Sequence, residues 1–170
     1  IIAIVAIVAA VLIAVAVIFS IFHAVKGRSP EKTVDQLVTS MFKLDADGII
    51  DTFPKEAVNK LKEEGNWDDE YDDLVSGIES IAQSVGEYVD LEKMCSYKIT
   101  ETKDATEDEI AEIQEDYDDE GIDVKIKDAK IMTVELTINI PIYGSETDSE
   151  DIVVIKIGNS WYIDPMNFSL

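Results

Sequence analysis

Three residue types that commonly build catalytic and metal sites are nearly missing from this sequence. The chain has one histidine, His23, one cysteine, Cys95, and one arginine, Arg28. Beyond residue 28 it therefore cannot build a Ser-His or Cys-His pair, a histidine metal site or an arginine clamp for phosphate. The single cysteine cannot form an internal disulfide and lies in no CxxC motif. We therefore predict that the protein is not an enzyme, has no catalytic residues, and uses no cofactor and no metal.

Basic residues are scarce relative to acidic ones. The chain contains 36 Asp or Glu against 14 Lys or Arg, and its formal net charge is -22 at pH 7. All the acidic residues lie beyond residue 28. Such a surface repels phosphate backbones and anionic headgroups, which excludes nucleic acid as a favoured partner. A protein or peptide partner of basic character suits this charge better.

The first 22 residues carry no formally charged side chain. They comprise 21 apolar residues and Ser20, and at about 1.5 Å per residue such a run spans the roughly 30 Å hydrocarbon core of a bilayer. The run shows neither the basic start nor the small-residue cleavage site of a secretory signal peptide. We predict a transmembrane helix over residues 1–25, which contacts the membrane through residues 1–22, followed by a short juxtamembrane linker over 26–28.

Two charge arguments bear on orientation. Lys26 and Arg28 flank the apolar run, and by the positive-inside rule they favour a cytoplasmic C-terminal side. The strongly acidic remainder suits the outer face of a membrane instead, and two flanking charges decide little. We predict a single-pass protein of the cell membrane whose residues 29–170 form an extracytoplasmic domain.

Beyond residue 28 the apolar pattern predicts helices first and strands afterwards. Helical spacing, with serine, proline and glycine at the ends, predicts helices over residues 30–44, 46–52, 54–65 and, less regularly, 74–85. Alternation of apolar and polar residues predicts strands over residues 94–102, 124–126, 134–142, 152–157 and 161–164. The polar run from Gly144 to Asp151 is expected to form a hairpin loop between two of these strands.

An acidic helix is predicted between the first two strands, over residues 106–120. Thr106 and Glu109 have the spacing of a capping box, and Gly121 follows the last turn. Residues 101–120 hold 11 carboxylates against one lysine. They could bind divalent cations loosely or face a basic partner, but we interpret them as a solvated surface.

The stretch LDADGIID resembles the middle of a calcium loop. If Gly48 is placed sixth in an EF-hand loop, Lys43 falls at the first ligand position and Pro54 at the twelfth. Neither side chain can coordinate calcium. We therefore interpret the stretch as a corner between two helices, in which Asp45 or Asp47 caps the second helix.

Helices followed by antiparallel strands predict an α+β domain whose N-terminal helices pack on one face of a curved antiparallel sheet. This order and the ending VVIKIGNSWYIDP resemble NTF2-like (cystatin-like α+β cone) domains of unknown function from bacterial membrane-anchored proteins and lipoproteins. A first helix like SPEKTVDQLVTSMFKLD and a corner like DADGIIDTFP extend the resemblance over residues 29–170. It implies a cone-shaped pocket between helices and sheet.

Four aromatic residues are candidates to line that pocket: Tyr97, Tyr143, Trp161 and Tyr162. Their side chains combine a large apolar surface with a polar atom. Trp161 and Tyr162 are neighbours on a predicted strand, so only one of them can face the core. The alternative for Trp161 is a purely structural place in that core.

These observations predict a membrane-anchored, non-catalytic binding or assembly module that presents an acidic NTF2-like domain outside the cell. Two alternatives within the family stay open. One is a VirB8-like scaffold subunit of a secretion or conjugation channel, which would form homo-oligomers. The other is a small isomerase or dehydratase that uses a pocket aspartate beside a tyrosine.

Overall fold

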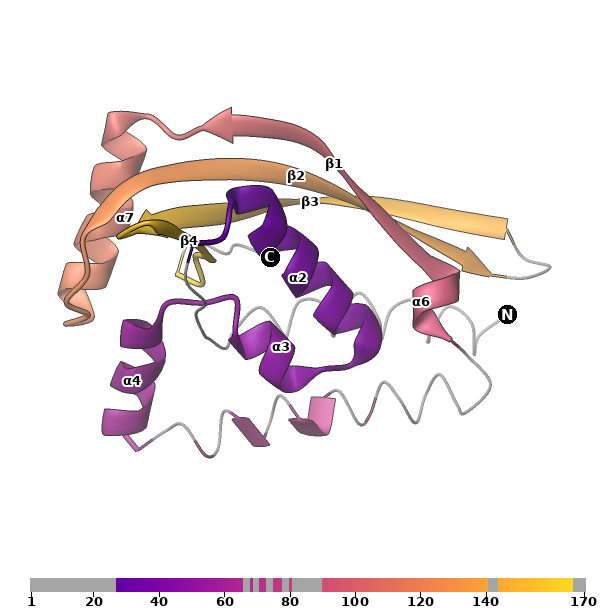
Figure 1. Cartoon of the computed structure of the whole chain (residues 1–170), viewed down its shortest axis with the longest axis horizontal. Helices are drawn as coiled ribbons and strands as arrows, with labels where there is room; N and C mark the ends of the chain where they lie inside the picture. Colours follow the sequence, from indigo (N-terminus) through magenta and orange to yellow (C-terminus); the bar gives the residue numbers. More distant parts are fainter. Residues whose placement is uncertain are drawn as a thin grey trace.

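The computed structural model describes residues 27–65, 68, 71–72, 75–77, 80, 90–140 and 144–166. These residues form helices and one four-stranded antiparallel sheet of order β1-β2-β3-β4 (Figure 1), which confirms the predicted α+β class. The predicted transmembrane helix and most of the helix predicted over 74–85 lie outside the described residues. Within the described part of the chain, no helix is both long and apolar enough to cross a membrane.

Three helices precede the sheet at nearly the predicted positions: α2 (Pro30–Lys43), α3 (Ala46–Ile50) and α4 (Lys55–Glu63). Ser29 Oγ accepts a hydrogen bond from the backbone N–H of Lys32 at 3.3 Å and caps α2. Asp45 Oδ1 accepts one from the N–H of Gly48 at 3.0 Å and caps α3. A short helix before the sheet, α6 (Leu91–Met94), was not predicted.

The sheet is built from β1 (Cys95–Asp104), β2 (Ile126–Ile140), β3 (Gly144–Ile157) and β4 (Ser160–Ile163). Helix α7 (Glu107–Asp119) connects β1 to β2 and lies at one end of the sheet (Figure 1). It begins with the predicted capping box, because Thr106 and Glu109 each bond the backbone N–H of the other.

The prediction of a hairpin loop over residues 144–151 is wrong, because this run is the first half of β3. It pairs in continuous register with β2. Side chains bond across the pair, Thr137 with Thr147 at 3.0 Å and Thr133 with Asp151 at 2.6 Å. Nearly every side chain of this half-strand is exposed, so its sequence lacks the apolar alternation that marks a half-buried strand.

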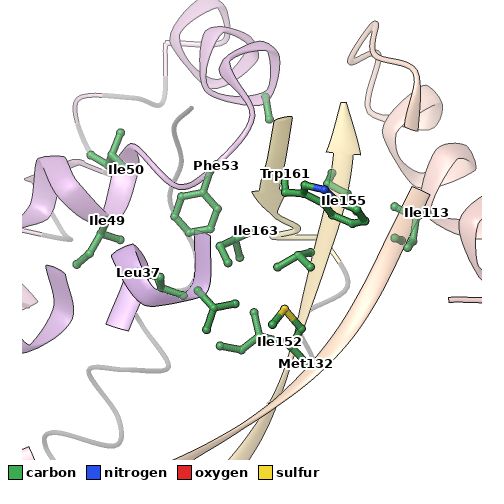
Figure 2. Close-up of a cluster of buried hydrophobic side chains, with 14 of the residues drawn as sticks. Leu37, Ile49, Ile50, Phe53, Ile113, Met132, Ile152, Ile155, Trp161 and Ile163 are labelled. Carbon is green, nitrogen blue, oxygen red and sulfur yellow. The ribbon is translucent and has the colours of Figure 1, made fainter. Parts of the chain in front are cut away.

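The hydrophobic core lies between the N-terminal helices and one face of the sheet (Figure 2). Met132 and Ile152 are register partners on β2 and β3, so their side chains share that face. The largest fully buried apolar side chains around them come from helices and strands alike: Leu37, Ile49, Phe53 and Ile163. Each such side chain contributes roughly 1.5–3 kcal/mol by leaving water.

The outer edge of β4 is covered by the N-terminal part of the domain. The backbone N–H of Trp161 donates to Arg28 O at 3.3 Å, and Thr33 Oγ1 donates to Trp161 O at 3.0 Å. The N–H of Ile163 donates to Thr52 O at 2.8 Å. Arg28, which was predicted to lie in the linker, therefore contacts the packed domain.

Candidate binding site between α2 and α3

An open hollow of about 590 Å³ lies where α2 turns into α3. This volume falls within the range of small-ligand sites, roughly 300–1,000 Å³. Its lining comes from α2, the corner and α3: Asp35, Gln36, Thr39, Ser40, Lys43, Asp45, Asp47, Gly48 and Asp51. The stretch LDADGIID thus forms most of one wall.

The corner that shapes the hollow depends on two backbone features. Leu44 has a φ of 56°, in the left-handed region, and this reverses the chain after α2. The N–H of Asp45 then donates to Ser40 O at 2.9 Å. Gly48 packs so closely on α2 that an added Cβ would overlap Ser40 Oγ and lie 2.5 Å from Asp45 Oδ2. A methyl group at position 48 would therefore force the Ser40 and Asp45 side chains to move.

The hollow is acidic. Four aspartates line it against one lysine, Lys43. The Lys43 ammonium lies 3.8 Å from the Glu92 carboxylate of α6, and both of these side chains are half exposed. A concave surface lined by one sign of charge concentrates counter-ions, so we expect the hollow to attract cationic groups.

Two tyrosines hold carboxylates of the hollow by hydrogen bonds. The Tyr97 hydroxyl on β1 donates to Asp35, and burial together with Asp35 raises the pKa of Tyr97 to about 12. The Tyr71 hydroxyl donates to Asp47 Oδ1 at 3.3 Å, and burial followed by the Asp47 charge raises the pKa of Tyr71. Both phenols therefore stay protonated at neutral pH and orient the carboxylates.

Arg28 forms hydrogen bonds with two residues that line the hollow. Its guanidinium donates to Gln36 Oε1 and to the carbonyl oxygen of Asp51, while Gln36 Nε2 donates to Gly48 O at 3.1 Å. Burial lowers the pKa of Arg28, and the Asp51 carboxylate opposes that shift. The sequence did not predict this role of Arg28, because a single arginine beside an apolar run carries no signal for it.

The structure does not bring the three described members of the predicted pocket set, Tyr97, Trp161 and Tyr162, together. Tyr97 lies at the edge of the hollow through its bond to Asp35. Trp161 is 7% exposed and belongs to the core, whereas Tyr162 points to the other face of β4 and is half-buried. Tyr143 lies outside the described residues.

A carboxylate beside a tyrosine occurs elsewhere, as the isomerase alternative requires. Tyr117 of α7 bonds Asp164, but both side chains are 0% exposed. A substrate cannot reach atoms that are closed off in this way. The Tyr117–Asp164 pair therefore has a structural role and connects α7 to the residue that follows β4.

The cap in LDADGIID confirms the helix-corner interpretation, since Asp45 Oδ1 bonds the N–H of Gly48. Within the described ranges, no three His, Cys, Asp or Glu side chains are grouped as a metal site requires.

No protein-family model, curated protein or solved structure matches this sequence.

Proposed function

We propose that this protein is a membrane-anchored, non-catalytic binding or assembly module that presents an acidic, NTF2-like α+β domain outside the cell. The observation that carries the proposal is the acidic hollow between α2 and α3, with four carboxylates in about 590 Å³. We further propose that it holds a cationic segment of a protein or peptide partner.

The hydrogen bonds around the hollow favour a lysine or arginine side chain as the bound group. A carboxylate can accept about four hydrogen bonds. Asp35 and Asp47 each accept one from a tyrosine, which leaves oxygen lone pairs for an ammonium or guanidinium donor. Such charge-assisted bonds are about twice as strong as neutral ones. Binding of this kind weakens as salt rises.

The place of Arg28 supports a site close to the membrane. Arg28 follows the predicted transmembrane helix by a few residues and bonds the wall of the hollow at Gln36 and Asp51. If residues 1–22 span the bilayer, the hollow lies near the point where the chain leaves it. A partner held there would be kept close to the membrane surface.

The two alternatives have less support. A VirB8-like scaffold requires homo-oligomers, and a detergent-solubilised chain that runs strictly as a monomer would count against it. An isomerase or dehydratase requires a deep pocket that holds a buried carboxylate beside a tyrosine. The Tyr117–Asp164 pair is buried but closed to a substrate, whereas the Tyr97–Asp35 and Tyr71–Asp47 pairs border an open hollow.

The binding proposal is tested with the full chain in nanodiscs of neutral lipid. The probe is an unstructured lysine-rich peptide, titrated at low salt by calorimetry. Asp47→Asn/Asp51→Asn keeps side-chain size and removes two charges, and we expect it to weaken binding by about tenfold. The matched control Glu112→Gln/Glu115→Gln removes two exposed charges from α7. Equal losses in both variants, or no binding at low salt, would contradict the proposal.

A further inference from the structure

Strand β3 has a strand neighbour on its outer side over only part of its length. β4 pairs with Val154–Ile157, and the N–H of Asp164 donates to Val153 O at 2.9 Å. Among the described residues, none pairs with the outer side of β3 between Gly144 and Ile152. In Figure 1 this half of β3 extends past α6, far from α7. Within the described part of the chain, this half of β3 is therefore an open strand edge.

The register identifies the backbone groups that point outward. The backbone N–H of Ile163 donates to Thr52 O, so the backbone N–H and C=O of Ile163 face away from β3. The backbone N–H and C=O of its register partner Val154 therefore face β2. Antiparallel strands alternate in this respect, and the β2–β3 register is continuous here. The N–H and C=O groups that face the open edge are therefore those of Ser145, Thr147, Ser149 and Asp151.

One hydrogen bond agrees with this assignment. The outward N–H of Ser149 is bonded to the carboxylate of its own neighbour, Asp148, at 2.8 Å. An amide that faced β2 would be engaged in the ladder instead.

The side chains along the open edge carry charge of one sign. Glu146, Asp148 and Glu150 occupy every second position, so they share one face of the sheet. Partial burial, followed by the charges of Asp148 and Asp151, raises the pKa of Glu150. The edge therefore presents a row of carboxylates next to backbone donors and acceptors that face outward.

This charge pattern selects the occupant. A second copy that paired along the same edge would place carboxylates against carboxylates, which destabilises cross-strand pairs. Charge on an edge strand is a common protection against such self-association. An extended segment with basic residues at alternate positions would instead face each acid with a cation.

We propose that the outer edge of β3, from Ser145 to Asp151, binds an extended basic segment of a partner protein as an additional antiparallel strand. Lysine or arginine at every second position of that segment faces Glu146, Asp148 and Glu150. Main-chain hydrogen bonds supply affinity in such strand addition, and alternate side chains supply specificity. The inference rests on the proposed function for the existence of a basic partner, but its surface is separate from the hollow.

The test uses the full chain in neutral-lipid nanodiscs and three peptides. The first carries lysine at alternate positions with threonine and valine between them. The second is N-methylated at the threonine and valine residues, whose amides face β3 when the lysines face the acids. The third is N-methylated at the lysines, whose amides face away. We expect the second to bind at least about tenfold more weakly than the first, and the third within about threefold of it.

Hydrogen exchange gives an independent readout of the same complex. The amides of Thr147 and Asp151 should gain protection on binding. The amides of Asp148 and Glu150, which face β2, should not change. Ser149 should gain less than Thr147, since its amide already bonds Asp148.

Charge-reversal variants test whether the peptide binds at the edge of β3 or at another acidic surface. Glu146→Lys/Asp148→Lys/Glu150→Lys should abolish binding, while the matched variant Glu112→Lys/Glu115→Lys/Asp119→Lys on α7 should retain it. Equal binding of all three peptides would show attraction by charge alone and would overturn the inference. Loss of binding only in Asp47→Asn/Asp51→Asn would also overturn it, yet would support the hollow as the site. No binding of any peptide would contradict both proposals.

Discussion

Tyr117 donates its hydroxyl hydrogen to the Asp164 carboxylate at 3.1 Å, and neither side chain is exposed to solvent. The same Asp164 oxygen accepts a bond from the N–H of Met166 at 3.1 Å. Tyr117 lies in the last turns of α7, and Asp164 directly follows β4. One buried hydrogen bond therefore connects the acidic inserted helix to the C-terminal end of the sheet.

Removing that hydroxyl should destabilise the domain. A hydrogen bond to a charged group contributes about 1.5–3 kcal/mol, so we expect Tyr117→Phe to lower the free energy of unfolding by about that amount. Urea denaturation measures the change. Tyr162→Phe, at a half-buried tyrosine on β4, is the control and should change the same quantity by less than about 0.5 kcal/mol. Similar small effects in both variants would show that the bond adds little.

The same pair predicts a loss of stability in alkali. Burial and then the Asp164 charge raise the pKa of Tyr117 well above its ordinary value of 10.0. The folded state thus prefers the neutral phenol, and this contribution is complete below pH 10.0 and lost as pH rises above it. The free energy of unfolding should fall above that pH in the parent protein and fall less steeply in Tyr117→Phe. Parallel curves for the two proteins would refute the prediction.

At the floor of the hollow, Gly48→Ala should destabilise the protein. Alanine favours a helix over glycine by about 1 kcal/mol, but its methyl group would meet Ser40 Oγ and the Asp45 carboxylate. Such overpacking costs about 1–3 kcal/mol, so we expect a lower melting temperature. The double variant Ser40→Ala/Gly48→Ala should recover part of the loss. A higher melting temperature in Gly48→Ala would mean that the corner is looser than the structure shows.

The elements that sequence reasoning predicted well are those with local signals. Ser29, Asp45 and the Thr106–Glu109 pair each cap a helix through atoms three residues apart. A sequence records such contacts directly, because both partners lie in one short stretch. The starts of α2, α3 and α7 could be predicted from these residues alone.

What the sequence did not reveal depends on distant partners. The half-strand from Gly144 to Ile152 is polar on nearly all its length, and only its pairing with β2 makes it a strand. Arg28 contacts the hollow through residues 8 and 23 positions away. Tyr117 and Asp164 are separated by 47 positions. Contacts of this kind follow from the fold, and no local pattern encodes them.

The acidic domain is proposed to lie on the outer side of a membrane, and every partner considered above depends on that placement. Labelling of a single cysteine in intact cells tests it most directly. Burial shields Cys95 and raises the pKa of its thiol, so the full chain is made with Cys95→Ser and with Glu112→Cys on the exposed face of α7. A membrane-impermeant maleimide should label Glu112→Cys fully before the cells are broken. Labelling that occurs only after lysis would place the domain in the cytoplasm and contradict the proposed function.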